Sequence, residues 1–127
     1  MAAVELAPGA GSNPLAVQMA GLLSHRLTSF PERVGTFERL GGRVAIVAAD
    51  AETSLTMRFD DRRAVLFDGI VGIPDLTLRA SSELIAGLPD RGAMALAQAV
   101  RDGRLQIHGL PGALPLLARL GRLLAGD

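Results

Sequence analysis

The chain has 127 residues, enough for one domain with one hydrophobic core and too few for two separate cores. Its formal net charge is zero, which argues against the clustered positive charge that nucleic-acid binding requires. It contains no cysteine, so disulfides, a thiolate nucleophile and cysteine-based zinc sites are excluded. Hydrophobic residues make up 49% of the chain, which fits either an interface with a partner or an apolar cavity.

The first residues lack the positive and apolar regions of a secretory signal, and no stretch reaches the about 20 apolar residues of a membrane span. We therefore expect a cytoplasmic protein without a transmembrane segment. Residues 1–12 are expected to form a disordered leader, and residues 13–127 a single domain. Every basic residue other than histidine is arginine, and this bias, with abundant alanine and glycine, is typical of a GC-rich bacterial genome.

The first helix is predicted from its ends. Asn13 is a favoured N-cap, and Pro14 suits the first helical position. Leucine and methionine then recur at helical spacing up to Ser29, and Pro31 ends the helix. A short second helical segment is expected before the glycine pair at 41–42.

Three strands are expected next, at Val44–Ala49, Ser54–Asp60 and Arg63–Phe67. The first is apolar throughout, as in a strand that is covered on both faces. The second alternates between apolar and polar residues, as in a half-buried strand. Asp-Asp and Asp-Gly pairs follow the second and third strands and predict turns. The pattern therefore indicates an antiparallel meander.

The rest of the chain mixes strands and helices. The predicted elements are a strand at Leu76–Ala80, helices at Ser82–Leu88 and Ala93–Arg101, a strand at Leu105–His108 and a final helix at Leu114–Ala125. Because strands and helices do not alternate strictly, the order predicts an α+β fold. We expect a five-stranded, mostly antiparallel sheet with four to five helices on one face.

No catalytic pattern accompanies the reactive residue types. His25 and His108 belong to no Ser-His-acid order and to no zinc-binding spacing, and we interpret both as structural or exposed. For Asp75, a hydrogen bond that braces a loop is the simpler interpretation, and acid–base catalysis is the alternative. Gly69–Gly72 lacks the lysine and helix start of a phosphate-binding loop, so we interpret it as a flexible connector that could serve as a cavity flap. We expect no catalytic residue, metal or cofactor.

Three stretches follow one another in an informative order. The first is Pro74–Leu78, which leads into the helix predicted from Ser82, and the second is Ala97–Gly109, a helix and a strand separated by Asp-Gly. The third is the leucine-rich helix Leu114–Leu124. This order and spacing resembles the sterol carrier protein 2 family of small lipid-binding domains, over about residues 15–124. The resemblance implies a sterol-carrier-like fold that binds a hydrophobic ligand without catalysis.

The resemblance also implies an aliphatic cavity between the sheet and its helices. The predicted faces place one set of apolar side chains around this cavity and four polar side chains at its mouth. The predicted lining is Leu55, Met57, Phe59, Phe67, Leu76, Leu78, Leu84, Leu88, Met94, Val100, Ile107, Leu116, Leu117, Leu120 and Leu124, and the predicted mouth is Arg79, Gln98, Gln106 and His108.

We therefore interpret the chain as a carrier of a lipid or another hydrophobic small molecule, such as a fatty acid, a fatty acyl-CoA or a polycyclic compound. The final helix would act as the lid, and burial of apolar ligand surface would drive binding. One alternative is an accessory or catalytic protein of a bacterial biosynthetic pathway for polyketides, quinones or terpenoids, which would use the same cavity and serve a partner enzyme. The other is an interaction domain that forms a homodimer through its leucine-rich helix.

Overall fold

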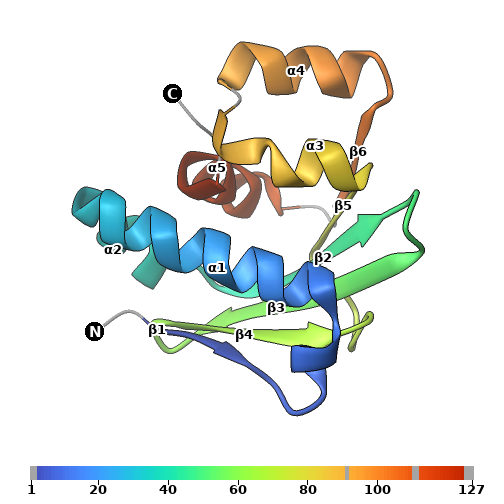
Figure 1. Cartoon of the computed structure of the whole chain (residues 1–127). Coiled ribbons are helices and arrows are strands. Elements are labelled where there is room, and N and C mark those ends of the chain that lie inside the picture. The colour runs from blue at the N-terminus through green and yellow to red at the C-terminus, as the bar shows by residue number, and fades with distance from the viewer. Residues whose placement is uncertain (1–2, 91, 110–111, 125–127) are drawn as a thin grey trace.

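The computed structural model describes residues 3–90, 92–109 and 112–124, and it shows a sheet with helices on one face (Figure 1). The sheet has six strands in the order β1-β4-β3-β2-β5-β6. The predicted α+β class is confirmed, with one strand more than expected. The strands are β1 (Ala3–Leu6), β2 (Gly42–Ala48), β3 (Thr53–Asp60), β4 (Arg63–Asp68), β5 (Leu76–Ala80) and β6 (Leu105–Gly109).

Five α-helices and three short 3-10 turns are described. α1 and α2 lie over the β2–β4 side of the sheet, whereas α3 lies nearer β5 and α4 is the outermost layer (Figure 1). The α-helices are α1 (Pro14–Ser29), α2 (Val34–Glu38), α3 (Ser82–Ala86), α4 (Ala93–Arg101) and α5 (Leu114–Leu124), and the 3-10 turns are Ala10–Ser12, Pro31–Arg33 and Leu88–Asp90.

The sheet is built around the predicted meander. β3 pairs antiparallel with both β2 and β4, and β6 pairs antiparallel with β5. β5 joins the other side of β2 in parallel, so the chain must cross the sheet between β4 and β5. Residues 69–75 make this crossing on the face that carries no helix, where Thr56 of β3 binds the crossing backbone through its side chain.

The expectation of a disordered leader at residues 1–12 was wrong for the residues that the structure describes. Ala3–Leu6 forms β1, which pairs in parallel with β4 at the edge of the sheet. Val4 packs against the core from this strand, and Ala10 in the following 3-10 turn is fully buried. The segment is ordered because it completes one edge of the sheet. Met1 and Ala2 lie outside the described residues.

Asn13 forms the predicted N-cap of α1 and also ties the helix to the sheet. Its side-chain oxygen accepts hydrogen bonds from the amides of Leu15 and Ala16, at 3.0 and 3.3 Å. Its Nδ2 donates to the Ser54 carbonyl and to the Asp68 carboxylate, both at 2.8 Å. This one side chain therefore caps the helix and fixes its start beside β3 and β4.

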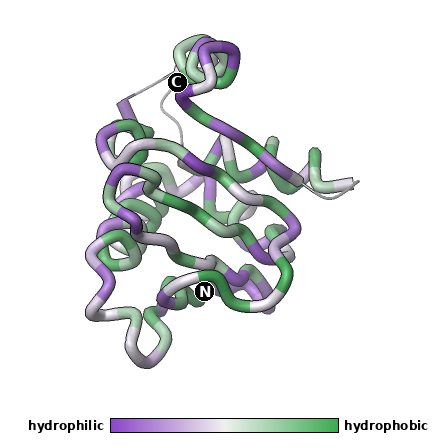
Figure 2. The backbone as a smooth tube through the Cα atoms, turned by 90° about the vertical axis from the view of Figure 1, so that its right-hand side faces the viewer, coloured by the Kyte–Doolittle hydropathy of each residue, from purple (hydrophilic) through white to green (hydrophobic). Residues whose placement is uncertain are grey.

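The period-two alternation of the strands separates the two faces of the sheet. The strand pairing aligns the apolar residues of neighbouring strands on the helix-covered face. Phe59 of β3 meets Phe37 of α2 there, with ring centroids 6.1 Å apart and planes at 83°, which is the favoured edge-to-face geometry. Figure 2 shows hydrophobic segments along the strands in the middle of the molecule. The strand residues on this face are Val44, Ile46, Ala48, Leu55, Met57, Phe59, Ala64, Leu66, Leu76, Leu78, Ala80, Leu105 and Ile107.

Candidate functional site

Most of the predicted lining residues lie on or against the helix-covered face, but their burial is uneven. Over the central strands the side chains are fully enclosed, and Leu55, Met57 and Phe59 are at most 1% exposed. Over β5 and β6 the covering is thinner, since the paired residues Leu78 and Ile107 are only half-buried. The other predicted lining residues that are buried are Leu76, Leu84, Leu88, Leu116 and Leu120.

Half-buried apolar side chains pack against the core on β1 and α1, and four more come from the elements on the β5–β6 side of the sheet. Leu78 and Ile107 belong to β5 and β6, Leu96 to α4 and Leu117 to α5, and all four pack against the buried core. α4 packs beside β6, and α5 begins beside the end of the same strand. We call these four residues the aliphatic corner.

The C-terminal end of α5 is hydrogen-bonded to side chains of α1 and of the 3-10 turn that follows it. Arg26 of α1, 5% exposed, donates from Nε to the Leu123 carbonyl at 3.0 Å. Arg33 donates from Nη1 to the Arg122 carbonyl at 2.8 Å. These donors satisfy carbonyls in the last turn of α5, which have no partner within their own helix.

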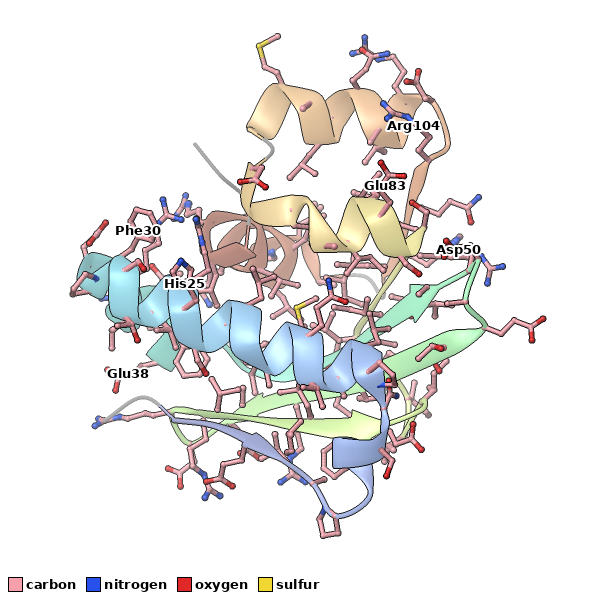
Figure 3. The ribbon with its side chains drawn as sticks, viewed as in Figure 1. His25, Phe30, Glu38, Asp50, Glu83 and Arg104 are labelled. Atoms are coloured by element: carbon pink, nitrogen blue, oxygen red, sulfur yellow. The ribbon has the colours of Figure 1, made fainter. Side chains whose placement is uncertain are left out.

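An aromatic ring completes this attachment. Both guanidinium carbons lie 4.6 Å from the centroid of the Phe30 ring, which follows the end of α1 (Figure 3). Contacts of this kind between a cation and an aromatic face are attractive and orient the guanidinium groups. We call Arg26, Phe30 and Arg33 the arginine clamp.

The N-terminal end of α5 is held differently, by close approach of small groups. A Cβ placed on Gly109 would lie 3.3 Å from both Ala113 Cβ and Leu76 Cδ1, so this strand end fits closely against the start of the helix. Leu114, at the first position of α5, is 76% exposed, and Leu116 is the first buried residue of the helix. No side-chain hydrogen bond is found for this first turn among the described residues.

No protein-family model matches the sequence, and no curated protein matches it either. Solved structures do match. A structure described as "UbiJ-SCP2 Ubiquinone synthesis protein" gives a TM-score of 0.65 at 23% identity, over 82% of this chain and 83% of that chain. The sterol carrier protein domain 2 of Helicoverpa armigera gives 0.64 at 18% identity, over 91% of this chain and 94% of that chain. Apo sterol carrier protein 2 from Yarrowia lipolytica gives 0.53 at 13% identity, over 84% and 89%.

The chain has the sterol carrier protein 2 fold. The resemblance drawn from the order of the Leu76–Leu124 elements is thereby confirmed at the level of the fold. Within this fold, the residues of the aliphatic corner come from β5, β6, α4 and α5, and the arginine clamp holds the C-terminal end of α5.

Three predicted lining residues are misplaced. Phe67 pairs with Thr56, so it lies on the helix-free face, opposite the Leu55 side of the sheet, where Arg58 lies 5.4 Å over its ring. Met94 and Val100 of α4 are 87% and 43% exposed. The Leu124 side chain lies outside what the structure describes.

The error in α4 has a simple cause. The predicted apolar stripe followed Met94, Ala97 and Val100, but α4 turns a different stripe inward. Ala99 is fully buried, and Leu96 packs against the core. Because most of the helix is alanine, its sequence defines its inner face weakly.

The four residues predicted at the cavity mouth do not converge there. Arg79 pairs with Gln106, and His108 pairs with Thr77, which places all three predicted residues on the helix-free face. Gln98 is exposed on α4 and donates to the Asp102 carboxylate at 3.0 Å, within its own helix end. None of these four polar side chains therefore lies on the face of the sheet that bears the aliphatic corner.

Asp75 has the loop-bracing role that was the simpler interpretation. Its Oδ2 accepts a hydrogen bond from the Arg43 amide at 2.9 Å, and its own amide donates to the Arg43 carbonyl at 2.9 Å. These bonds join the starts of β2 and β5. Gly42 is required beside them, because its φ is +113° and a Cβ there would lie 2.6 Å from Asp75 Oδ2.

The histidine assignments agree with the structure. His25 is exposed on α1 (Figure 3), with Nε2 3.4 Å from Ser29 Oγ, and His108 is exposed on β6. Among the described residues, no group of three or more histidine, aspartate or glutamate side chains is arranged to hold a metal ion. In the same residues, no helix combines the length and hydrophobicity that crossing a membrane requires.

Gly69–Gly72 is not a flap over the helix-covered face. The segment crosses the opposite face, where the Thr56 hydroxyl donates to the Gly69 carbonyl at 2.8 Å and accepts from the Val71 amide at 2.9 Å. Thr56 is fully buried beneath it. The connector is therefore anchored in its middle by a side chain of the sheet.

The arginine clamp was missed from the sequence. An arginine in the last turn of a helix normally interacts with its own helix end, and α1 is also closed by the Phe30 amide, which donates to the Arg26 carbonyl. The available signal was that Arg26 falls on the apolar stripe that Met19 and Leu23 define. A charged residue on such a stripe indicates a buried polar partner.

Proposed function

We propose that this chain binds and carries a hydrophobic small molecule, with the aliphatic corner as the binding site and α5 as its cover. The observation that carries the proposal is the half-burial of Leu78, Leu96, Ile107 and Leu117 on the helix-covered face of a sterol carrier protein 2 fold. Covering partly exposed apolar side chains with a ligand stabilises the complex, by about 25 cal/mol for each Å² of apolar surface removed from water.

The chemistry of the corner sets the ligand class. It is aliphatic, with no tyrosine or tryptophan in the whole chain and no charged side chain among its four members. A fatty acid, an acyl chain or a polycyclic hydrocarbon fits such a surface, because each buried CH₂ group contributes about 0.8 kcal/mol without needing a polar partner. The related structures point to the same class, since two of them are named as sterol carrier proteins.

The experiment uses a fluorescent fatty acid and two neighbouring residues of β6. Ile107 and His108 follow one another and lie on opposite faces of the sheet. We expect Ile107→Phe to fill the corner and weaken probe binding at least about tenfold, or 1.4 kcal/mol. His108→Phe adds an aromatic ring to the helix-free face and should leave the affinity unchanged.

The native ligand is sought by organic extraction of the purified protein followed by mass spectrometry. The carrier proposal fails if no lipid co-purifies and no lipid probe saturates. If a probe saturates but both β6 variants bind it as the wild type does, the ligand is bound elsewhere and the aliphatic corner is not the site.

A second function is favoured by one comparison. The structure with a TM-score of 0.65 is described as a ubiquinone synthesis protein, so an accessory role in a bacterial, cytoplasmic biosynthetic pathway is our alternative. In that role the corner would hold a quinone, polyketide or terpenoid intermediate for a partner enzyme. The same mass spectrometry separates the two functions, because an isoprenoid or ring-containing product supports the alternative and fatty acids support the carrier.

The apolar face of the leucine-rich helix α5 is already buried against other helices of this chain. Leu120 and Leu123 are 1% and 0% exposed because α5 packs against α1 and α2. Its apolar face therefore contributes to the core, which removes the basis for proposing a homodimer through this helix.

A further inference from the structure

The segment that crosses the helix-free face carries an unusual group of exposed side chains. Ile70, Val71 and Ile73 are 55%, 41% and 76% exposed. The other large hydrophobic residues that are exposed in the described parts of the chain lie on α1, α4, α5 and β1, and none of them is within four positions of another. Single exposed apolar residues are ordinary, but three within four positions form a patch. We call these three residues the crossing patch.

The crossing patch is held outward by its backbone. Thr56 binds the backbone on both sides of Ile70, at the Gly69 carbonyl and the Val71 amide. At the other end, Gly72 has a φ of +72°, and a Cβ on it would lie 2.8 Å from an Arg43 guanidinium nitrogen. The backbone therefore lies close against the sheet, and its three aliphatic side chains remain at the surface.

Two arginines lie on the same face of the sheet as the patch. Arg43 lies under Gly72, and Arg79 lies on the same face of the sheet, on β5. Neither guanidinium has a carboxylate within 4.0 Å among the described residues. The nearby acidic residues have other partners: Asp60 pairs with Arg58 at 3.6 Å, Glu5 pairs with Arg63 at 3.4 Å, and Asp75, at the end of the crossing, accepts a hydrogen bond from the Arg43 backbone amide at 2.9 Å.

We propose that the helix-free face docks on an anionic lipid bilayer, with Ile70, Val71 and Ile73 entering the interface and Arg43 and Arg79 binding lipid phosphates. Peripheral membrane binding draws on apolar insertion and on attraction of basic side chains to anionic lipids. Both elements occur here on one face. The inference does not depend on a ligand in the aliphatic corner, which lies on the other face of the sheet.

A second copy of the chain fits this face less well. A two-fold interface brings the same patch of both copies together, so Arg43 and Arg79 of one copy would lie close to those of the other. The resulting like-charge repulsion opposes such a dimer. An anionic bilayer supplies the opposite charge and an apolar interior.

Co-sedimentation of the full chain with vesicles tests the proposal. We expect binding to vesicles of phosphatidylcholine with phosphatidylglycerol, weaker binding to vesicles of phosphatidylcholine alone, and loss of the difference as ionic strength rises from about 0.01 to 0.15 M. The double variant Ile70→Ser/Ile73→Ser should bind anionic vesicles at least about tenfold more weakly. Arg79→Gln should weaken the same binding about fivefold and leave phosphatidylcholine vesicles unaffected.

The matched control is Met94→Ser/Leu114→Ser, which removes two side chains that are 87% and 76% exposed on α4 and α5. It should bind vesicles as the wild type does, and all variants should keep the wild-type unfolding transition. The proposal is overturned if the wild type does not bind anionic vesicles, or if Ile70→Ser/Ile73→Ser binds them normally. It is also overturned if the control loses as much binding, or if the wild type is a dimer that Ile70→Ser/Ile73→Ser dissociates.

Discussion

Replacing Arg26 by alanine should release the last turn of α5 from the helices that cover the sheet. The change removes the bond from Nε to the Leu123 carbonyl, and it leaves that carbonyl without this donor in a buried position. A hydrogen bond from a charged group contributes roughly 1.5–3 kcal/mol, and the contact with the Phe30 ring adds roughly 0.5–1 kcal/mol. We therefore expect the free energy of unfolding to fall by about 2–4 kcal/mol.

Urea denaturation measures this loss, and amide hydrogen exchange locates it. The amides in the last turn of α5 should exchange faster in Arg26→Ala, whereas those of β3 should follow only the global change in stability. Arg119→Ala is the control, because Arg119 is exposed on the same helix with no hydrogen bond or ion pair to the described residues. A loss below about 1 kcal/mol, or equal losses in the two variants, would refute the role that we assign to the clamp.

Three further predictions concern the turns and crossings that position the sheet. Gly42→Ala should cost about 1–3 kcal/mol in urea denaturation, because φ is +113° there and the new Cβ meets Asp75 Oδ2; a change within experimental error would contradict this. Thr56→Val should cost about 1–3 kcal/mol and speed exchange of the amide that its hydroxyl binds, and unchanged exchange would show that the crossing is held otherwise. Hydrogen bonds from the Ser82 amide and hydroxyl lower the pKa of Asp50 (Figure 3). Since the pKa of Asp50 is lower in the folded state, these bonds stabilise the fold above the unfolded-state pKa, and this stabilisation is lost as pH falls through the folded-state pKa. NMR titration should show the Asp50 pKa rising in Ser82→Ala. No rise would contradict the role given to the Ser82 hydroxyl.

The sequence predicts elements well where strong local signals mark their ends. α1, β5 and α4 occupy the predicted residues, Pro14–Ser29, Leu76–Ala80 and Ala93–Arg101. α1 begins at Pro14 after the N-cap Asn13 and ends just before Pro31. Gly103, with a φ of +77°, follows the end of α4. Such signals act within a few residues, so one sequence is enough to find them.

β1 had no comparable local signal. Ala3–Leu6 is only four residues long, and its partner β4 is about sixty positions away in the chain. Its stability comes from pairing at the edge of the sheet and from packing of Val4 on the core. A four-residue segment beside glycine and proline is typical of a disordered end, and only the assembled sheet shows otherwise.

The candidate site was predictable as a face of the sheet but not as a place on that face. Alternation assigned Leu55, Leu78 and Ile107 to the covered side, because the side chains of a strand alternate. It could not show that β4 pairs in the register that turns Phe67 away. Nor could it show that Leu78 and Ile107 are less buried than Leu55, because this depends on how closely α4 and α5 approach.

If α5 covers a ligand site, as proposed, the burial of its residues indicates which end would move when a ligand enters. Leu123 and Leu120 are 0% and 1% exposed, Leu116 is 8% exposed, and Leu114 is 76% exposed. Lifting the first turn therefore exposes less apolar surface than lifting the last turn, and it leaves the bonds of the arginine clamp intact. On the proposed function, α5 opens from its N-terminal end and pivots at the clamp. That end begins beside β6, where the half-buried Ile107 lies, so the ligand reaches the least covered part of the core by the least costly movement of the helix.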